Sequence, residues 1–258
     1  MNAPSARDRM VAPAITLPST TLLGRATDQV LERKISGVPI TDGDEAGALV
    51  GIVTTTDLLA DWVRDSSQFG SRSVADIMRQ PVFTVTPEAS VAEVANVLGR
   101  ERVHRVVVTA EERVLGVVSS SDLLIDVKAS GESAPLSTLM VRDISTIDLG
   151  TPVDEAITSL DLARVHGIVV VDGTRPVGVL THREALLSRR LPASLRAQPV
   201  EEIMSYETIC LDDDTPIHRA AAYAMAMHVR RLLVVSKGHL VGIVSAFDLV
   251  GTLALGKR

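Results

Sequence analysis

Gly51-Ile52-Val53-Thr54-Thr55-Thr56-Asp57-Leu58-Leu59 has the pattern of a buried β-strand that runs into a helix, with a hydroxyl and a carboxylate at the junction. Related stretches begin at Gly116, Gly178 and Gly242, which follow at intervals of 65, 62 and 64 residues. So regular a period indicates one structural unit used four times. A unit of about 60 residues is marginal as a lone domain, so we expect the units to stack in pairs and share cores.

Further landmarks recur at fixed distances and complete the unit as β-α-β-β-α. A methionine opens each unit, a strand position follows six residues later, and an amphipathic helix comes next, with apolar residues at helical spacing such as Val91, Val94 and Leu98. A short apolar strand then precedes the strand that starts with glycine. The methionines are Met10, Met78, Met140 and Met204, the strand positions are Thr16, Thr84, Thr146 and Cys210, and the helices are expected to begin near Leu23, Val91, Val153 and Ile217.

The composition narrows the class of protein. The 258 residues carry a net charge of −6 with 2% aromatic residues, which argues against a nucleic-acid binder, because such proteins normally present a basic surface. A single cysteine, Cys210, excludes an internal disulfide. Residues 1–7 lack the apolar stretch of a secretory signal, and no apolar run reaches the length of about 18 residues needed for a membrane span. We therefore expect a soluble, cytoplasmic protein without a membrane partner.

These residues resemble the CBS-domain family. The resemblance is carried by the methionine segments 74–78 and 200–204, the middle strand with its basic start at 103–108, and the Gly-h-h-Ser/Thr-x-x-Asp turn, in which h is apolar. It implies four CBS units at residues 6–64, 74–128, 136–190 and 199–254. It further implies an α/β fold of the α+β type, in which units pair into two modules that assemble into a pseudo-symmetric disc. The polar stretch 129–135 is a plausible boundary between two halves of two units each.

The Ser/Thr-x-x-Asp turn supplies the candidate ligand residues. Its carboxylate can accept hydrogen bonds from both hydroxyls of a ribose, and the helix start offers backbone N–H groups that favour anions. The resemblance implies that Asp57, Asp122 and Asp248 hold a ribose with Thr54, Ser119 and Ser245 as partners. The same pattern is also a capping box, which needs no ligand. The third copy, Thr181 to Glu184, suits a cap better than a ribose because glutamate is one methylene longer.

Basic residues before the middle strand are the second candidate feature. The resemblance implies that a phosphate near the aspartate of one unit is contacted by the basic pair of its partner unit, and an arginine fork suits phosphate oxygens. This pairs Asp57 with His104 and Arg105, and Glu184 with Arg230 and Arg231. Asp122 and Asp248 would instead face Ser36-Gly37 and His166-Gly167, which offer little to a phosphate. Aliphatic side chains, Ile15, Val38 and Val53, would hold the adenine in the first cleft.

The leading hypothesis is a ligand-sensing regulatory protein that binds an adenine nucleotide (AMP, ADP or ATP) in clefts between paired units. The alternatives are a scaffold or dimerisation protein without a ligand, and a sensor of another adenosyl ligand such as S-adenosylmethionine or a cyclic dinucleotide. We expect no enzyme activity, because no nucleophile elbow or phosphate-binding loop is present. We also expect no cofactor and no metal, since the six histidines and the run 212–214 lack ligand spacing. The expected partner is a second copy, as a homodimer, or a regulated protein.

Overall fold

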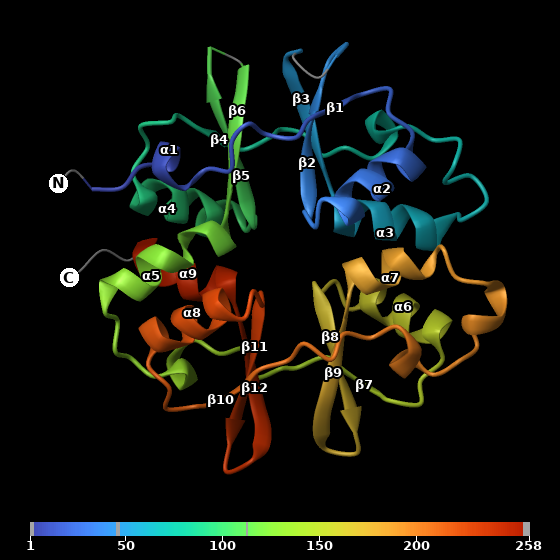
Figure 1. Ribbon diagram of the computed structural model, residues 1–258, viewed down its shortest axis with the longest axis vertical. Helices are drawn as coiled ribbons and strands as arrows, with labels where there is room; N and C mark the ends of the chain where they lie inside the picture. The colour runs from blue at the N-terminus through green and yellow to red at the C-terminus, as the bar shows by residue number, and fades with distance from the viewer. Residues whose placement is uncertain (1–2, 45–46, 112, 255–258) are drawn as a thin grey trace. The chain divides into compact units, whose positions relative to one another are not determined.

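The computed structural model describes residues 3–44, 47–111 and 113–254. Each of the four repeats forms its own three-stranded sheet (Figure 1). In every sheet the first strand runs parallel to the second, and the third runs antiparallel to the second. The strands are β1 (Leu17–Pro18), β2 (Gly37–Thr41) and β3 (Leu49–Thr54), then β4 (Thr84–Val85), β5 (Arg105–Ala110) and β6 (Arg113–Ser119), then β7 (Thr146–Asp148), β8 (Gly167–Asp172) and β9 (Arg175–Thr181), and finally β10 (Cys210–Asp212), β11 (Arg231–Ser236) and β12 (His239–Ser245).

A helix joins the two parallel strands of each repeat, because a parallel pair needs a crossover connection. These four helices are α2 (Leu23–Glu32), α4 (Val91–Glu101), α6 (Val153–Leu162) and α8 (Ile217–Ala226). They begin at the four residues that the apolar spacing predicts, and those residues are buried. The predicted strand position is confirmed at Thr84, Thr146 and Cys210, whereas the first strand begins at Leu17, one residue after Thr16.

A second helix follows the last strand of each repeat. These helices are α3 (Thr55–Arg64), α5 (Leu124–Ser130), α7 (His182–Ser188) and α9 (Ala246–Ala254). In the second repeat a 3₁₀ turn, η2 (Ser120–Leu123), precedes α5. The remaining short elements are α1 (Ala6–Arg9), η1 (Val74–Asp76), η3 (Leu136–Thr138), η4 (Ala193–Leu195) and η5 (Val200–Glu202). Within the described residues, no helix has both the length and the apolar character that crossing a bilayer requires.

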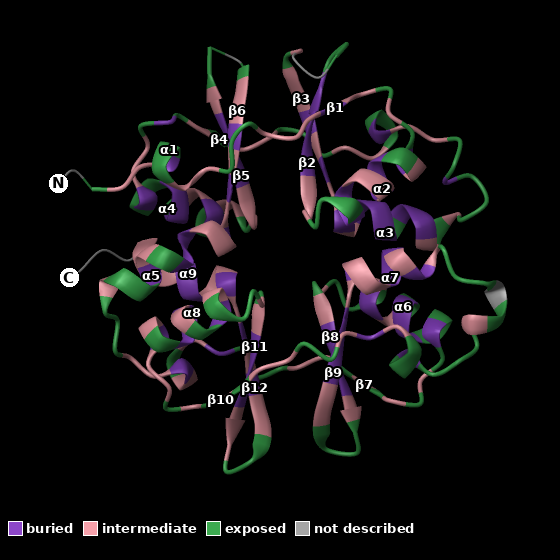
Figure 2. Cartoon of the chain, viewed as in Figure 1, coloured by how far each residue is buried: buried purple, intermediate pink, exposed green. Residues whose placement is uncertain are grey.

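The chain divides into two compact units that share cores across repeats. Among the described residues, unit 1 comprises 3–14, 82–111, 113–143 and 208–254, and unit 2 comprises 15–44, 47–81 and 144–207. Unit 2 therefore joins the bodies of repeats one and three, and unit 1 joins those of repeats two and four. One buried apolar cluster lies in each unit and draws side chains from both of its repeats. Figure 2 shows that buried residues lie along both the strands and the helices.

The compact units do not coincide with the two halves expected on either side of residues 129–135, since each unit takes one repeat from each half. The helices explain why. In unit 2, α3 packs against α6 and α7, and in unit 1, α5 and α4 pack against α8 and α9. The apolar faces that one repeat cannot bury alone are thus buried against the helices of the repeat two positions along the chain.

The lead-in segments, residues 5–11, 73–79, 135–141 and 199–205, each pack on the neighbouring repeat rather than on the repeat that they open. Met10 lies on Gly116, Met78 on Gly51, Met140 on Gly242 and Met204 on Gly178. In each case the residue after the methionine forms an antiparallel bridge with the residue after the glycine. The glycines are necessary here, because a Cβ at Gly51 would lie 2.5 Å from the sulfur of Met78.

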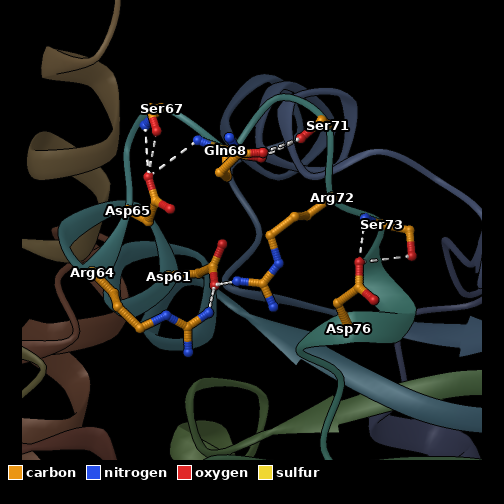
Figure 3. A network of polar contacts seen from close by, with 9 residues as sticks. All are labelled: Asp61, Arg64, Asp65, Ser67, Gln68, Ser71, Arg72, Ser73 and Asp76. Atoms are coloured by element: carbon orange, nitrogen blue, oxygen red, sulfur yellow. Dashed lines mark hydrogen bonds and ion pairs between the residues drawn. The ribbon is translucent and has the colours of Figure 1, made fainter.

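A polar network fixes the connection between α3 and η1 in unit 2 (Figure 3). Asp61 is buried and accepts hydrogen bonds from the side chains of Arg64 and Arg72. Asp65 caps the following turn by accepting bonds from the backbone and hydroxyl of Ser67. Asp76 accepts bonds from Ser73 at the start of η1. This long connection is therefore held by charged side chains on its own residues.

Candidate functional site

The Ser/Thr-x-x-Asp turns have the same geometry in three repeats. Oδ2 of Asp57 accepts hydrogen bonds from the backbone N–H of Thr54 at 2.9 Å and from its hydroxyl at 2.6 Å. Oδ2 of Asp122 accepts the same two bonds from Ser119, at 2.7 and 2.6 Å, and Oδ2 of Asp248 accepts them from Ser245, at 2.7 and 2.6 Å. One oxygen of each carboxylate is therefore used by the capping interaction.

The third repeat caps its helix in the same way with glutamate. Oε2 of Glu184 accepts bonds from the backbone N–H of Thr181 at 3.2 Å and from its hydroxyl. The additional methylene is thus accommodated without loss of the cap. The capping alternative accounts for one carboxylate oxygen at all four turns and leaves the second oxygen to be explained.

That second oxygen distinguishes the turns. In the described part of the chain, no donor is placed on Oδ1 of Asp122 or Asp248, and both residues are half-buried. Oδ1 of Asp57 instead accepts a hydrogen bond from Nε of Arg79 at 2.5 Å. Asp57 is correspondingly the most buried of the three, at 8% exposure. The structure therefore provides two turns with an open acceptor and one with a covered acceptor.

Arg79 was not among the residues singled out from the sequence. It follows Met78 in the lead-in segment, and its backbone pairs with Ile52, with N–H···O distances of 2.9 and 3.2 Å. The equivalent residues are Val11, Val141 and Ser205. A basic residue at this position in one repeat of four is the signal that could have identified it.

The basic residues lie at the starts of the middle strands in unit 1. Arg105 begins β5 and Arg231 begins β11, each preceded by its basic neighbour, His104 or Arg230. The ring of His104 lies 5.0 Å from that of Phe247 at an angle of 52°, so it packs against the residue before Asp248. Asp57 and Glu184 belong to unit 2. Their pairing with Arg105 and Arg231 therefore stays a prediction. It also stays a prediction that Asp122 faces Ser36-Gly37 and that Asp248 faces His166-Gly167.

The expected aliphatic wall is corrected in part. Val38 and Val53 pair in register and are 0% and 1% exposed within the core cluster of unit 2. Alternation along a strand sends their side chains toward the helices, so Pro39 and Ile52 lie on the opposite face of the sheet. Ile15 is half-buried and remains a candidate.

The helix starts of repeats one and three meet within unit 2 at a group of polar side chains. The hydroxyl of Thr56 lies 3.4 Å from Nδ1 of His166 and 3.3 Å from Nδ1 of His182. The two imidazole rings are 5.6 Å apart and perpendicular. In residues 3–44, 47–111 and 113–254, no three His, Cys, Asp or Glu side chains are grouped as metal ligands.

A pocket of about 380 Å³ lies in unit 1 beside β10 and α8. Its lining includes Cys210, Asp214, Arg219 and Tyr223, and none of the predicted ligand residues. Burial raises the pKa of the Cys210 thiol above its usual value, which disfavours the thiolate. The pocket is thus separate from the Ser/Thr-x-x-Asp turns.

Comparison with known proteins identifies the repeats. The family model of the CBS domain matches residues 6–63, 74–128, 136–189 and 200–255. Among solved structures, a protein of Methanocaldococcus jannaschii proposed to be an archaeal homologue of the γ subunit of AMPK superposes with a TM-score of 0.86. It is 17% identical, and the superposition covers 97% of this chain and 100% of that one. At this identity the likeness establishes the fold.

Curated relatives match about half of the chain. A CBS domain-containing protein of Dictyostelium discoideum is 31% identical over 127 residues, which cover 45% of this chain and 88% of that protein. The human 5'-AMP-activated protein kinase subunit gamma-3 is 31% identical over 118 residues, and the A-adding tRNA nucleotidyltransferase of Geobacter sulfurreducens is 31% identical over 120. These two matches cover 43% and 46% of this chain, but only 24% and 13% of the relatives.

Proposed function

The chain belongs to the CBS-domain family, and from that premise we propose that it is a regulatory protein that binds an adenosine-containing ligand at its Ser/Thr-x-x-Asp turns. The observation that carries the proposal is that the two oxygens of the Asp122 carboxylate, and likewise those of Asp248, have different roles. Oδ2 of Asp122 and of Asp248 caps its helix, while Oδ1 accepts no bond from the described residues. A half-buried carboxylate oxygen without a donor is suited to accept a hydroxyl of a ligand.

An adenine nucleotide is the ligand class that we propose. The kinase whose gamma-3 subunit is 31% identical to part of this chain is, by its name, activated by AMP. Arg105 and Arg231 each begin a strand and pair with the serine of the turn in their own repeat, Ser119 and Ser245. Their guanidinium groups would suit a phosphate. S-adenosylmethionine and cyclic dinucleotides that contain an adenylate carry the same adenosine group and are the alternative ligands to be tested alongside.

The test is a calorimetric titration of the protein with AMP, ADP, ATP, S-adenosylmethionine and a cyclic dinucleotide. Asp122→Ala and Asp248→Ala should each lower the affinity for the ligand that binds. Glu93→Ala is a matched control, because Glu93 accepts the same two bonds from Ser90, at 2.6 and 2.8 Å, in a capping box at the start of α4. Either variant loses the carboxylate of a capping box, so only a difference in affinity between the variants counts.

A scaffold that binds no ligand is the second candidate, favoured by the capping bonds at all four turns. Under this alternative the Asp122→Ala and Glu93→Ala variants would behave alike, with a lower melting temperature and no change in any affinity. Absence of binding by all five compounds would establish it over the sensor. A phosphate-release assay with ATP checks our further expectation that the repeats bind without turnover.

The partner of a regulatory protein must sense its bound state, because a ligand shifts an equilibrium only through different affinity for the two states. We propose that the partner is a second copy of the chain or a separate regulated protein. Sedimentation velocity with and without the bound ligand distinguishes these possibilities, since a ligand-linked homodimer changes its sedimentation coefficient in the pure protein.

A further inference from the structure

The Asp57 turn differs from its two counterparts by one ion pair. Nε of Arg79 lies 2.5 Å from Oδ1 of Asp57. The carboxylate is 6% exposed, whereas the arginine side chain is 67% exposed. Arg79 therefore lies over the carboxylate from the solvent side and can leave it without disturbing a packed core.

The backbone of Arg79 is held while its side chain is not. Arg79 and Ile52 exchange two backbone hydrogen bonds, and Met78 packs against Gly51 immediately before them. This bridge sets the start of the arginine side chain next to the strand that leads into Asp57. Beyond Asp57, the described residues give the guanidinium no other hydrogen-bond partner. The pair thus consists of a fixed acceptor and a movable donor.

The ion pair limits what Asp57 can still accept. A carboxylate has about four lone-pair positions, two on each oxygen. The cap uses both positions of Oδ2, through the backbone and hydroxyl of Thr54. Arg79 takes one of the two positions of Oδ1, so a single position remains. A vicinal diol brings two donors and can place both on Oδ1 only if Arg79 moves away.

We propose that Arg79 makes the Asp57 turn selective for adenosyl ligands that carry an anionic group. Displacing the guanidinium from Asp57 is unfavourable, and a phosphate on the same ligand offsets this loss by accepting the freed guanidinium, a geometry that arginine forks favour. A neutral nucleoside offers it no acceptor. The turns of Asp122 and Asp248 have Val11 and Val141 at the equivalent position and lack this selection. The inference rests on the proposed function and adds to it a role for one residue.

The test compares AMP with adenosine by calorimetry on full-length variants. In an Asp122→Ala/Asp248→Ala background, which leaves Asp57 as the acceptor among the three aspartates, Arg79→Met is expected to lower the ratio of the adenosine Kd to the AMP Kd by at least about fivefold, as expected for a site-coupling effect. Adenosine should bind more tightly and AMP no more tightly. Equal changes for the two ligands, or no change, would overturn the inference.

The reverse experiment installs the arginine. In an Asp57→Ala/Asp122→Ala background, Val141→Arg should raise the preference of the Asp248 turn for AMP over adenosine by about fivefold. Val141 is 46% exposed, so the substitution buries no charge. Val11→Arg is the second variant and tests the Asp122 turn, with Asp122 kept as the acceptor, because Val11 is also exposed. An unchanged preference in both folded variants would contradict the inference.

The outcomes separate this inference from the function on which it rests. If the protein binds adenosyl ligands but the two arginine experiments leave selectivity unchanged, only the role of Arg79 is wrong. If neither the wild type nor any variant binds AMP or adenosine, the role of Arg79 and the adenine-nucleotide proposal are both wrong, and only binding of S-adenosylmethionine or a cyclic dinucleotide would keep the sensor. If adenosine binds only after Arg79→Met, both are supported, because removal of the ion pair has exposed the acceptor.

Discussion

The thioether of Met78 packs directly against Gly51, although Met78 opens the second repeat and Gly51 belongs to the first. A Cβ at Gly51 would lie 2.5 Å from the sulfur and 3.0 Å from the Cβ of Met78. At each of the other three glycines an added Cβ would likewise lie 2.5–2.8 Å from a methionine sulfur. Glycine within the last strand of each repeat is thus required by a neighbouring segment rather than by backbone conformation.

Gly51→Ala is expected to destabilise the protein, because the contact at 3.0 Å involves the Cβ of Met78, which cannot rotate away. Overpacking of this kind costs about 1–3 kcal/mol in chemical denaturation. Met78→Ala in the same chain should restore part of the loss, since it removes the sulfur and Cγ at 2.5 and 2.8 Å and keeps only the Cβ contact. Gly24→Ala is the control, since a Cβ there meets nothing within 4 Å and alanine stabilises a helix. Equal effects at Gly51 and Gly24 would contradict the packing explanation.

Arg9→Ala should weaken the attachment of the N-terminal segment to α5. Nε and Nη2 of Arg9 bond the two oxygens of Asp126 at 2.7 and 2.8 Å, and the side chains are 22% and 11% exposed. Loss of charged hydrogen bonds of this kind costs about 1–3 kcal/mol. Arg9→Lys should recover only part of it, because lysine cannot form the paired contact.

Arg7→Ala is the matched control two residues away. Arg7 pairs with Glu88, but their side chains are 57% and 73% exposed. Solvent screens an exposed pair, so the free energy of unfolding should hardly change. If Arg7→Ala were as destabilising as Arg9→Ala, burial of the Arg9 pair would not be the cause.

The network around Asp61 predicts an order of effects. Arg72 is 27% exposed and Arg64 is 63% exposed, and both donate to the buried Oδ1 of Asp61. Arg72→Ala should therefore destabilise the protein more than Arg64→Ala, because solvent already screens the latter pair. Asp61→Ala should cost about 1–3 kcal/mol. Thermal denaturation of the three variants checks the order, and a larger effect of Arg64→Ala would refute it.

The cap of α4 predicts a defined response to acid. Hydrogen bonds from the backbone and hydroxyl of Ser90 lower the pKa of Glu93 below its usual value of 4.5. A lowered pKa means that the unfolded chain binds the proton more readily, so this stabilisation is complete above pH 4.5 and is lost as the pH falls through the lowered value. The melting temperature of the wild type should fall more steeply there than that of Glu93→Gln. Parallel curves would show that the cap contributes nothing.

Local structure was largely predictable from the repeats. The helix starts at Leu23, Val91, Val153 and Ile217 are confirmed, because apolar residues at helical spacing and preceding loop residues act within a few positions. The Ser/Thr-x-x-Asp turns were also located, since the residues that form them are adjacent. The shared cores were expected, but the repeats that share each core could not be assigned, because the helices of all four repeats present similar apolar faces and the sequence does not specify which will meet.

The site was predicted less completely for the same reason. Asp57, Asp122 and Asp248 were identified by a local pattern, while Arg79 reaches Asp57 across 22 positions through a strand pairing that no periodicity reveals. Val38 and Val53 were expected to face a ligand, yet both are in the core. Alternation in a short strand predicts two faces and does not say which of them meets the helices.

The chain alternates between its compact units, and this constrains how the protein can be made. Unit 2 can complete its core only when residues 144–207 have packed on residues 15–44 and 47–81. Unit 1 can complete its core only after residues 208–254 have been synthesised. On the ribosome, where domains generally fold in order of synthesis, the early repeats must therefore remain without their helical partners until the later ones emerge. A nascent chain paused after the second repeat would expose the apolar faces of α3 and α5, and it is at that stage that chaperone contact would be most needed.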